Sequence, residues 1–220
     1  MTPPLELLVF LGSTRDSTPP RPARLGGRVA RALVAQMEKA GCKVQLIDAL
    51  DHDLPGPFKP HFSYARGQAP EALNELAGQI ESADGYVMVS PEYNHSMSPA
   101  LAHLLNHFGS SLFSYKPSAI ATYSAGQWGG ARAAVTMRTF LSELGCLPVS
   151  AMIHVPKAHE VLDDDGTCLE GVDGEHWQSY FNRTLLQLAW WAEAAKRQRS
   201  EGETRRPGAL NRNPSQRNAP

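Results

Sequence analysis

Cysteine is scarce in this sequence, and long hydrophobic runs are absent. The 220 residues contain three cysteines, Cys42, Cys146 and Cys168, and no two of them form a CxxC pair. An odd number of widely spaced cysteines argues against a disulfide framework or a structural zinc site. No apolar run approaches the roughly 20 residues of a membrane helix, and no basic segment precedes the short apolar stretch near the N-terminus. We therefore expect a cytoplasmic protein with no membrane partner.

Strong charge of either sign is also missing, but the charge is unevenly distributed. The formal net charge is −1, whereas residues 196–220 contain seven Lys or Arg and two Asp or Glu. The preceding 195 residues carry 14 basic and 20 acidic side chains, which argues against a nucleic-acid surface. Because the end of the chain has almost no apolar side chains, we predict one folded domain over residues 1–195 and a basic, disordered tail over residues 196–220.

Five short apolar segments alternate with five segments of helical periodicity. The apolar segments span residues 5–11, 43–47, 85–89, 118–123 and 147–154, and the helical ones begin near residues 25, 72, 99, 131 and 177. Near-continuous hydrophobicity is typical of strands buried on both faces, and the alternation predicts a parallel sheet with helices on both faces. In a doubly wound sheet of order 2-1-3-4-5, strands one, three and four lie side by side. The loops that follow them would then share the carboxyl edge of the sheet, where ligands bind.

The loop after the first strand, GSTRDST, has the composition of a phosphate site. Its glycine exposes the backbone, Ser13 and Ser17 offer hydroxyls, and Arg15 supplies a fixed cation shortly before a helix. The loop matches neither a Walker P-loop nor GxGxxG, which disfavours a nucleoside triphosphate or a dinucleotide in this site. An ordinary polar turn that caps the helix is the alternative. Whether Arg21 or Arg24 also reaches a phosphate is left open.

The loops after strands three and four are rich in residues that can hold a planar ring. In the first of them, PEYNH, Tyr93 offers an apolar wall with a polar tip and Asn94 offers an amide for polar substituents. In the second, SAGQWGG, glycines let the backbone approach a ligand closely. Each loop also has a purely structural interpretation. In PEYNH, Asn and Glu can cap the next helix, and in SAGQWGG the glycines can form only a flexible connection between strand and helix.

Other chemically suggestive groupings are weaker. His103 and His107 lie four apart on one predicted helix with His95 upstream, but HExxH is absent and no carboxylate completes a metal site, so we expect none. The Ser-x-Gly after strand four does not match GxSxG, which disfavours hydrolysis. We expect the aromatic face from Trp177 to Trp191 to belong to the core or to a dimer interface.

Taken together, the segments GSTRDS, SPEYNHSMSPALAHLLNHF and SAGQWGGARAAVTMRTFLSELG resemble the NADPH-dependent FMN reductase-like family of flavodoxin-fold proteins. That family includes quinone, chromate and azo-dye reductases, and the resemblance covers residues 5–155. It implies a flavodoxin-like, doubly wound, five-stranded parallel sheet that binds FMN. The residues implied to bind the cofactor are Ser13, Arg15 and Ser17 at the phosphate, Pro91, Glu92, Tyr93, Asn94 and His95 along the ribityl chain and the ring, and Ser124, Gly126, Gly129 and Gly130 on the other flavin edge.

The resemblance also implies an enzyme. It would pass two electrons from NADPH or NADH through bound FMN to a small acceptor such as a quinone, an azo compound, free flavin or a metal oxyanion. The flavin carries this chemistry, so no catalytic side chain is required. Members of the family are usually homodimers or homotetramers. The alternative is a non-catalytic, flavodoxin-like electron carrier or regulatory module, and the mild acidity of residues 1–195 favours the enzyme because flavodoxins are normally strongly acidic.

Overall fold

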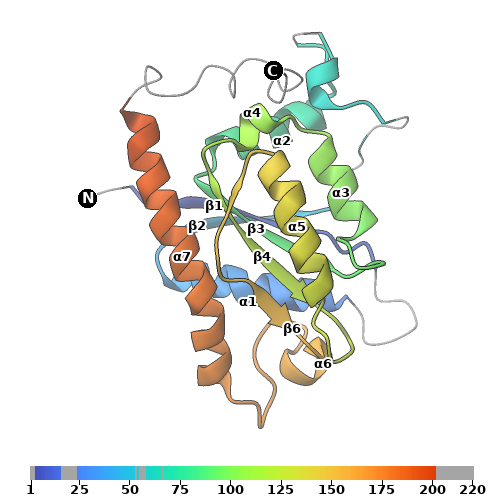
Figure 1. The fold of residues 1–220 in the computed structure, drawn as a ribbon, viewed down its shortest axis with the longest axis vertical. Helices are drawn as coiled ribbons and strands as arrows, with labels where there is room; N and C mark the ends of the chain where they lie inside the picture. The colour runs from blue at the N-terminus through green and yellow to red at the C-terminus, as the bar shows by residue number, and fades with distance from the viewer. Residues whose placement is uncertain (1–2, 16–23, 53, 55–57, 66, 202–220) are drawn as a thin grey trace.

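The computed structural model describes residues 3–15, 24–52, 54, 58–65 and 67–201, which are organised around one parallel sheet (Figure 1). The strands are β1 (Glu6–Leu11), β2 (Lys43–Asp48), β3 (Gly85–Pro91), β4 (Pro117–Tyr123), β5 (Leu147–Pro148) and β6 (Ile153–Val155). Hydrogen-bonded neighbours follow the order β2-β1-β3-β4-β5, and β6 also pairs with β4. All the pairings are parallel, so the predicted order 2-1-3-4-5 is confirmed.

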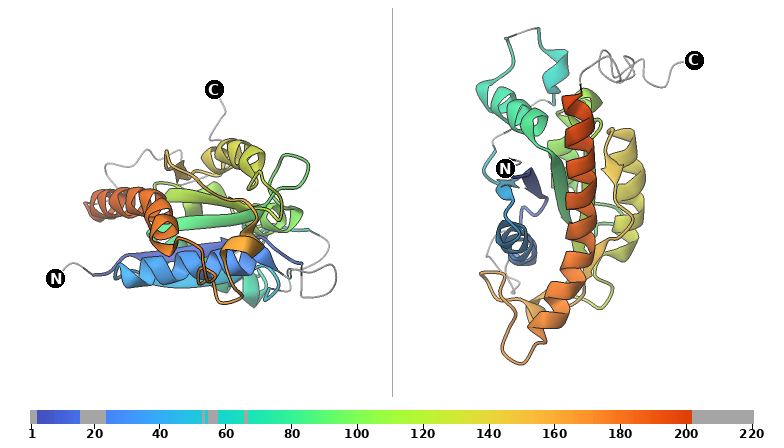
Figure 2. Two further views of the ribbon diagram at one scale, coloured as in Figure 1. Left: turned by 90° about the horizontal axis from the view of Figure 1, so that it is seen from below. Right: turned by 90° about the vertical axis from the view of Figure 1, so that its left-hand side faces the viewer.

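The sheet separates two apolar cores, one on each face. The helices are α1 (Leu25–Lys39), α2 (Glu71–Ser82), α3 (Pro99–Asn106), α4 (Ser110–Phe113), α5 (Ala131–Glu143), α6 (Ala158–Val161) and α7 (Gly174–Ser200), with a 3-10 turn, η1, at His61–Ser63. In β1, Leu7 and Val9 pack with α1 and α7, whereas Leu8 and Phe10 pack with α2, α3 and α5. Figure 2 shows α1 and α5 on opposite faces of the sheet. Burial on both faces explains why these strands have continuous rather than alternating hydrophobicity.

The segment predicted as a single fifth strand, residues 147–154, consists of two short strands instead, so that prediction is wrong. β5 pairs with the first two residues of β4, and β6 pairs with its last three. Between these pairings the edge segment has two residues more than β4, and Pro148 has no N–H to donate to the ladder. The displaced backbone is bonded elsewhere, since Arg138 Nη1 donates to the Val149 carbonyl oxygen at 2.8 Å.

The aromatic face of α7 belongs largely to the core, as expected. Phe181, Leu185 and Leu188 are buried in the apolar core that α7 shares with α1. Trp191, in contrast, is 42% exposed. Within the described residues no helix, α7 included, is both long and apolar enough to cross a membrane.

α7 also extends past the predicted domain boundary at residue 196. Lys196 Nζ lies 2.7 Å from Asp84 Oδ2, and Arg199 Nη2 lies 2.9 Å from Asp84 Oδ1. The Asp84 side chain is only 6% exposed, so these two cations compensate a buried carboxylate and hold the last turns of the helix against the domain. A disordered tail that begins at residue 196 is therefore wrong for residues 196–201. The remainder of the predicted tail lies outside the described residues.

Candidate functional site

Three strand-end loops meet at the carboxyl edge of the sheet around one hollow of about 400 Å³. The residues that line it are Gly12, Ser13, Thr14, Arg15, Pro91, Glu92, Tyr93, Ser98, Pro99, Ala100, Tyr123, Ser124 and Ala125. They come from the loop after β1, from the end of β3 with its following loop and the start of α3, and from the end of β4 with its following loop. The sequence prediction that these loops converge is therefore confirmed.

The candidate cofactor residues divide into two groups by position. Those that line the hollow are Ser13, Arg15, Pro91, Glu92, Tyr93 and Ser124. Those that lie elsewhere in the same loops are Asn94, His95, Gly126, Gly129 and Gly130. Ser17 lies outside the described residues. The binding role of each residue remains a prediction.

The loop after β1 is held tightly against the start of α3. Gly12 N donates to the Val89 carbonyl oxygen at 2.9 Å, and Ser98 Oγ donates to the Gly12 carbonyl oxygen at 2.5 Å. Ser98 Oγ also accepts the Leu101 N–H at 3.1 Å, which makes Ser98 the cap of α3. A Cβ atom on Gly12 would lie 2.5 Å from Leu101 Cβ, so only glycine allows this approach. The backbone that lines one wall of the hollow is consequently fixed.

α1 begins beside this loop. Its N-cap residue, Arg24, adopts the left-handed conformation with φ of 41° and makes no side-chain capping hydrogen bond. Arg24 Nη2 instead donates to the Ser13 carbonyl oxygen at 2.8 Å and pairs with the Asp48 carboxylate. The start of a helix carries partial positive charge, which favours an anion at this end of the hollow. The Arg24 guanidinium is thus engaged by protein groups, and Arg21 lies outside the described residues.

The loop after β3 forms a tight turn. Tyr93 and Ser96 exchange two backbone hydrogen bonds of 2.9 Å, and the residues between them, Asn94 and His95, have φ of 49° and 62°. Asparagine tolerates this left-handed conformation better than most residues. Asn94 and His95 are consequently exposed at the tip of the turn, while the Tyr93 ring, 51% exposed, stands at the rim of the hollow.

Glu92 ties the loop after β3 to the start of α5. Its carboxylate accepts from Arg132 Nε at 2.8 Å, lies 2.7 Å from Arg132 Nη2 and accepts the Ala133 N–H at 3.4 Å. A carboxylate at a helix N-terminus interacts favourably with the helix dipole. The Glu92 side chain therefore links two of the three loops.

Glycines shape the loop after β4. Ser124 Oγ donates to the Gly126 carbonyl oxygen at 2.7 Å and accepts the Gly129 N–H at 2.9 Å. Gly129 and Gly130 have φ of 58° and 75°, and a Cβ on Gly130 would lie 2.8 Å from Thr122 Cβ. The conformation of the turn therefore requires glycine at both positions. The sequence alone does not show whether a glycine is needed for the turn or for contact with a ligand.

Tyr123, the last residue of β4, is a lining residue that the sequence interpretation missed. The sequence pattern indicates only a strand residue at this position, yet Tyr123 is 5% exposed and forms part of the hollow. Burial raises the pKa of its hydroxyl to about 12. The available signal was a tyrosine placed between a buried strand and a glycine-rich loop.

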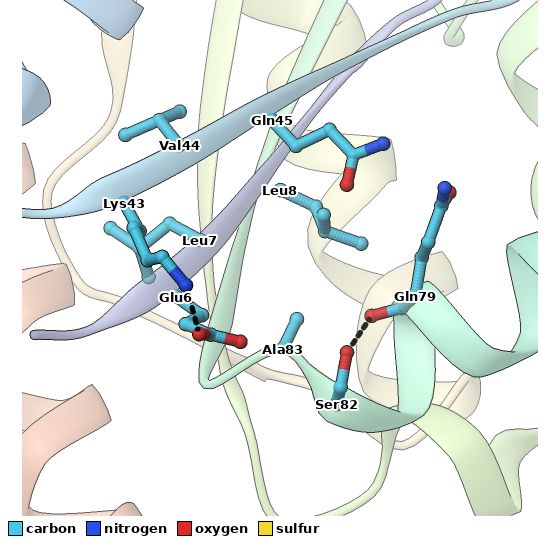
Figure 3. Close-up of a pocket in the computed structure, with 9 residues that line it drawn as sticks. All are labelled: Glu6, Leu7, Leu8, Lys43, Val44, Gln45, Gln79, Ser82 and Ala83. Atoms are coloured by element: carbon cyan, nitrogen blue, oxygen red, sulfur yellow. Dashed lines mark hydrogen bonds and ion pairs between the residues drawn. The ribbon is translucent and has the colours of Figure 1, made fainter. Parts of the chain in front are cut away.

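A second, smaller hollow lies at the opposite edge of the sheet (Figure 3). It has a volume of about 220 Å³ and lies between the first residues of β1 and β2 and the end of α2. Glu6 and Lys43 at its side form an ion pair of 2.9 Å. It has neither a helix start nor strand-end loops, so the carboxyl-edge hollow is the candidate site.

His103 and His107 contact each other rather than a wider cluster. Their Nε2 atoms are 3.3 Å apart, and the Phe58 ring centroid lies 4.7 Å from that of His107. Burial and the neighbouring His103 lower the pKa of His107. Across the described part of the chain, no group of three or more His, Cys, Asp or Glu residues could hold a metal ion.

A family model described as NADPH-dependent FMN reductase matches residues 5–160. The chain is 31% identical over 144 residues to a quinone reductase of Escherichia coli, which covers 64% of this chain and 71% of that protein. It is 38% identical over 72 residues to an NADPH azoreductase of a Bacillus species, which covers 33% of this chain and 40% of that protein.

Among solved structures, the fold is similar to that of FerB, a flavoenzyme NAD(P)H:(acceptor) oxidoreductase from Paracoccus denitrificans. The TM-score is 0.66 at 20% identity, and the match covers 87% of this chain and 98% of that one. The azoreductase match spans well under two thirds of that relative, whereas the quinone reductase match exceeds two thirds. Because the family model covers most of the chain, the protein belongs to the NADPH-dependent FMN reductase family.

Proposed function

We propose that this protein is an FMN-dependent oxidoreductase that passes two electrons from NADPH or NADH to a small-molecule acceptor. The observation that carries the proposal is the convergence of three strand-end loops on one hollow of about 400 Å³. Family membership supports it. FMN supplies the two-electron chemistry when bound, and the chain supplies binding, orientation and electrostatics.

The residues at one end of the hollow fit the phosphate of FMN. The start of α1 lies there, and Gly12 holds the adjoining backbone close. Ser13 and Arg15 line this end, and a guanidinium can form paired hydrogen bonds to a phosphate. We retain these two residues, with Ser17, as the proposed phosphate ligands.

The residues at the other end fit a flat ring. Pro91 would contact it from the end of β3, Tyr93 from the following loop, and Ser124 from the loop after β4. Glu92 fixes the distance between these two loops through α5. The remaining candidates, Asn94, His95, Gly126, Gly129 and Gly130, stay proposed as cofactor-binding residues. All but Gly126 have the positive φ that shapes these two loops.

The proposed acceptors are quinones and azo compounds. The named activities of the quinone reductase and azoreductase relatives support this class of substrate. The exposed Tyr93 ring at the rim gives an apolar surface on which a planar acceptor can lie. Since donor and acceptor would use the same open face in turn, we expect ping-pong kinetics.

Anaerobic titration tests the proposal. Purified protein is loaded with FMN and titrated with NADPH or NADH while the flavin absorbance is followed. Bleaching without a partner reductase supports the enzyme. Bound FMN that neither nicotinamide bleaches would favour the non-catalytic carrier or regulatory module, and failure to retain FMN would overturn both.

We further propose a cytoplasmic homodimer or homotetramer. Apolar side chains that are exposed on α7, Leu186 at 66% and Trp190 at 62%, support self-association. Size-exclusion chromatography with light scattering measures the oligomeric state, and a monomer at micromolar concentration would contradict this proposal.

A further inference from the structure

The Tyr123 side chain reaches from the end of β4 to the first turn of α1. A Cβ atom on Gly26, the second residue of α1, would lie 2.4 Å from the Tyr123 hydroxyl oxygen and 2.8 Å from Cζ. The hydroxyl therefore lies where any side chain on Gly26 would be. The absence of a side chain at Gly26 therefore leaves the space that the Tyr123 hydroxyl occupies at the start of α1.

The surroundings of this hydroxyl are polar and positively charged. Burial raises the pKa of this hydroxyl, whereas the nearby Ser13 side chain and the positive charges of Arg24 and Arg15 act to lower it. Ser13 and Tyr123 are both 5% exposed, and both line the hollow. The Tyr123 hydroxyl is thus a buried hydrogen-bond donor close to two cations and to the start of a helix. Such surroundings favour the binding of an anion.

We propose that the Tyr123 hydroxyl donates a hydrogen bond to the phosphate of bound FMN and that Gly26 provides the space for it. This inference rests on the proposed function and deepens it. It makes Tyr123 a determinant of cofactor choice, because riboflavin has the same ring and ribityl chain but no phosphate for the hydroxyl to bind.

A role in packing alone is the competing interpretation. Tyr123 belongs to the apolar core that includes Leu11 and Leu25, and its ring would contribute there without its hydroxyl. Burial raises the pKa of the hydroxyl to about 12, so at neutral pH it keeps its proton and can donate. Phenylalanine separates the two interpretations because it keeps the ring and removes only the donor.

The test compares the affinities of the full chain for FMN and riboflavin, measured by quenching of flavin fluorescence. We expect Tyr123→Phe to weaken FMN binding about tenfold or more and riboflavin binding by less than about twofold, as for loss of a hydrogen bond to a charged group. Gly26→Ala should have the same selective effect, because its Cβ would displace the hydroxyl.

Tyr86→Phe is the matched control. The Tyr86 hydroxyl donates to the Ile80 carbonyl oxygen at 2.8 Å near the amino end of β3, far from the carboxyl-edge loops. This variant should lose stability and keep the FMN to riboflavin affinity ratio of the unchanged protein.

Equal losses of FMN and riboflavin affinity in folded Tyr123→Phe, or no loss of either, would overturn the inference. Circular dichroism establishes that the variant is folded. If the unchanged protein binds neither flavin, the proposed function fails, and the inference fails with it. The two failures are therefore distinguishable.

Discussion

Arg15 is the residue whose proposed role is simplest to test. It lines the hollow next to the start of α1, where a fixed cation can bind a phosphate. Arg15→Ala should weaken FMN binding by about 1.5–3 kcal/mol, the contribution of a charge-assisted hydrogen bond, with little effect on riboflavin. Arg31→Ala is the control, because Arg31 Nε donates at 2.8 Å to the Asp164 carbonyl oxygen instead. Unchanged FMN affinity in Arg15→Ala would refute the phosphate assignment.

His107 should make folding sensitive to acid. Burial and His103 lower its pKa from 6.5 in the folded chain, so below that pH the unfolded chain binds more protons. Stability should therefore begin to fall as pH is lowered through about 6.5, the pKa of histidine in the unfolded chain. His107→Asn should reduce this slope in urea unfolding series measured at several pH values.

Part of the slope should remain in that variant. Burial and the charge of Arg183 also lower the pKa of His154, which contributes in the same direction. Identical slopes for His107→Asn and the unchanged protein would show that His107 does not titrate as expected.

At the scale of elements, α7 depends on one buried carboxylate. Asp84 accepts the Glu6 N–H at 3.0 Å and pairs with both Lys196 and Arg199. Asp84→Asn should lower the free energy of unfolding by about 1–3 kcal/mol because it removes charge-assisted hydrogen bonds. Urea denaturation measures the change. The control, Lys43→Met, removes only an exposed pair and should cost at most about 1 kcal/mol, and equal losses in the two variants would contradict this account.

Most elements were predictable because their signals are local. Ser98 followed by Pro99 predicted the start of α3, and the structure has Ser98 as the cap and Pro99 as the first helical residue. The division of the last strand was not predictable in this way. The segment between β5 and β6 has two residues more than the part of β4 that it faces. The excess is visible only once the two strands are paired, and the sequence does not give their register.

For the whole molecule, the proposed cofactor should stabilise the fold by mass action. FMN at about 100 times its Kd should raise the unfolding free energy by about 2.7 kcal/mol, and Tm by roughly 5–10 °C for a chain of this size. Differential scanning calorimetry with and without FMN measures the shift. NADPH alone is the control and should have a smaller effect, and an unchanged Tm at saturating FMN would argue against binding in the hollow.

The alternation of apolar strands and amphipathic helices was sufficient to predict a parallel sheet with helices on both faces, because period and burial are encoded by neighbouring residues. The strand order, and with it the edge at which three loops meet, came from the known doubly wound arrangement and not from the alternation itself. Contacts between residues far apart in the sequence could be identified only from the folded chain. Tyr123 against Gly26 and Asp84 against Arg199 join segments far apart in sequence, and no local pattern specifies which of them will meet. The general location of the candidate site thus follows from sequence, whereas its buried hydroxyl and the end of α7 were decided by packing.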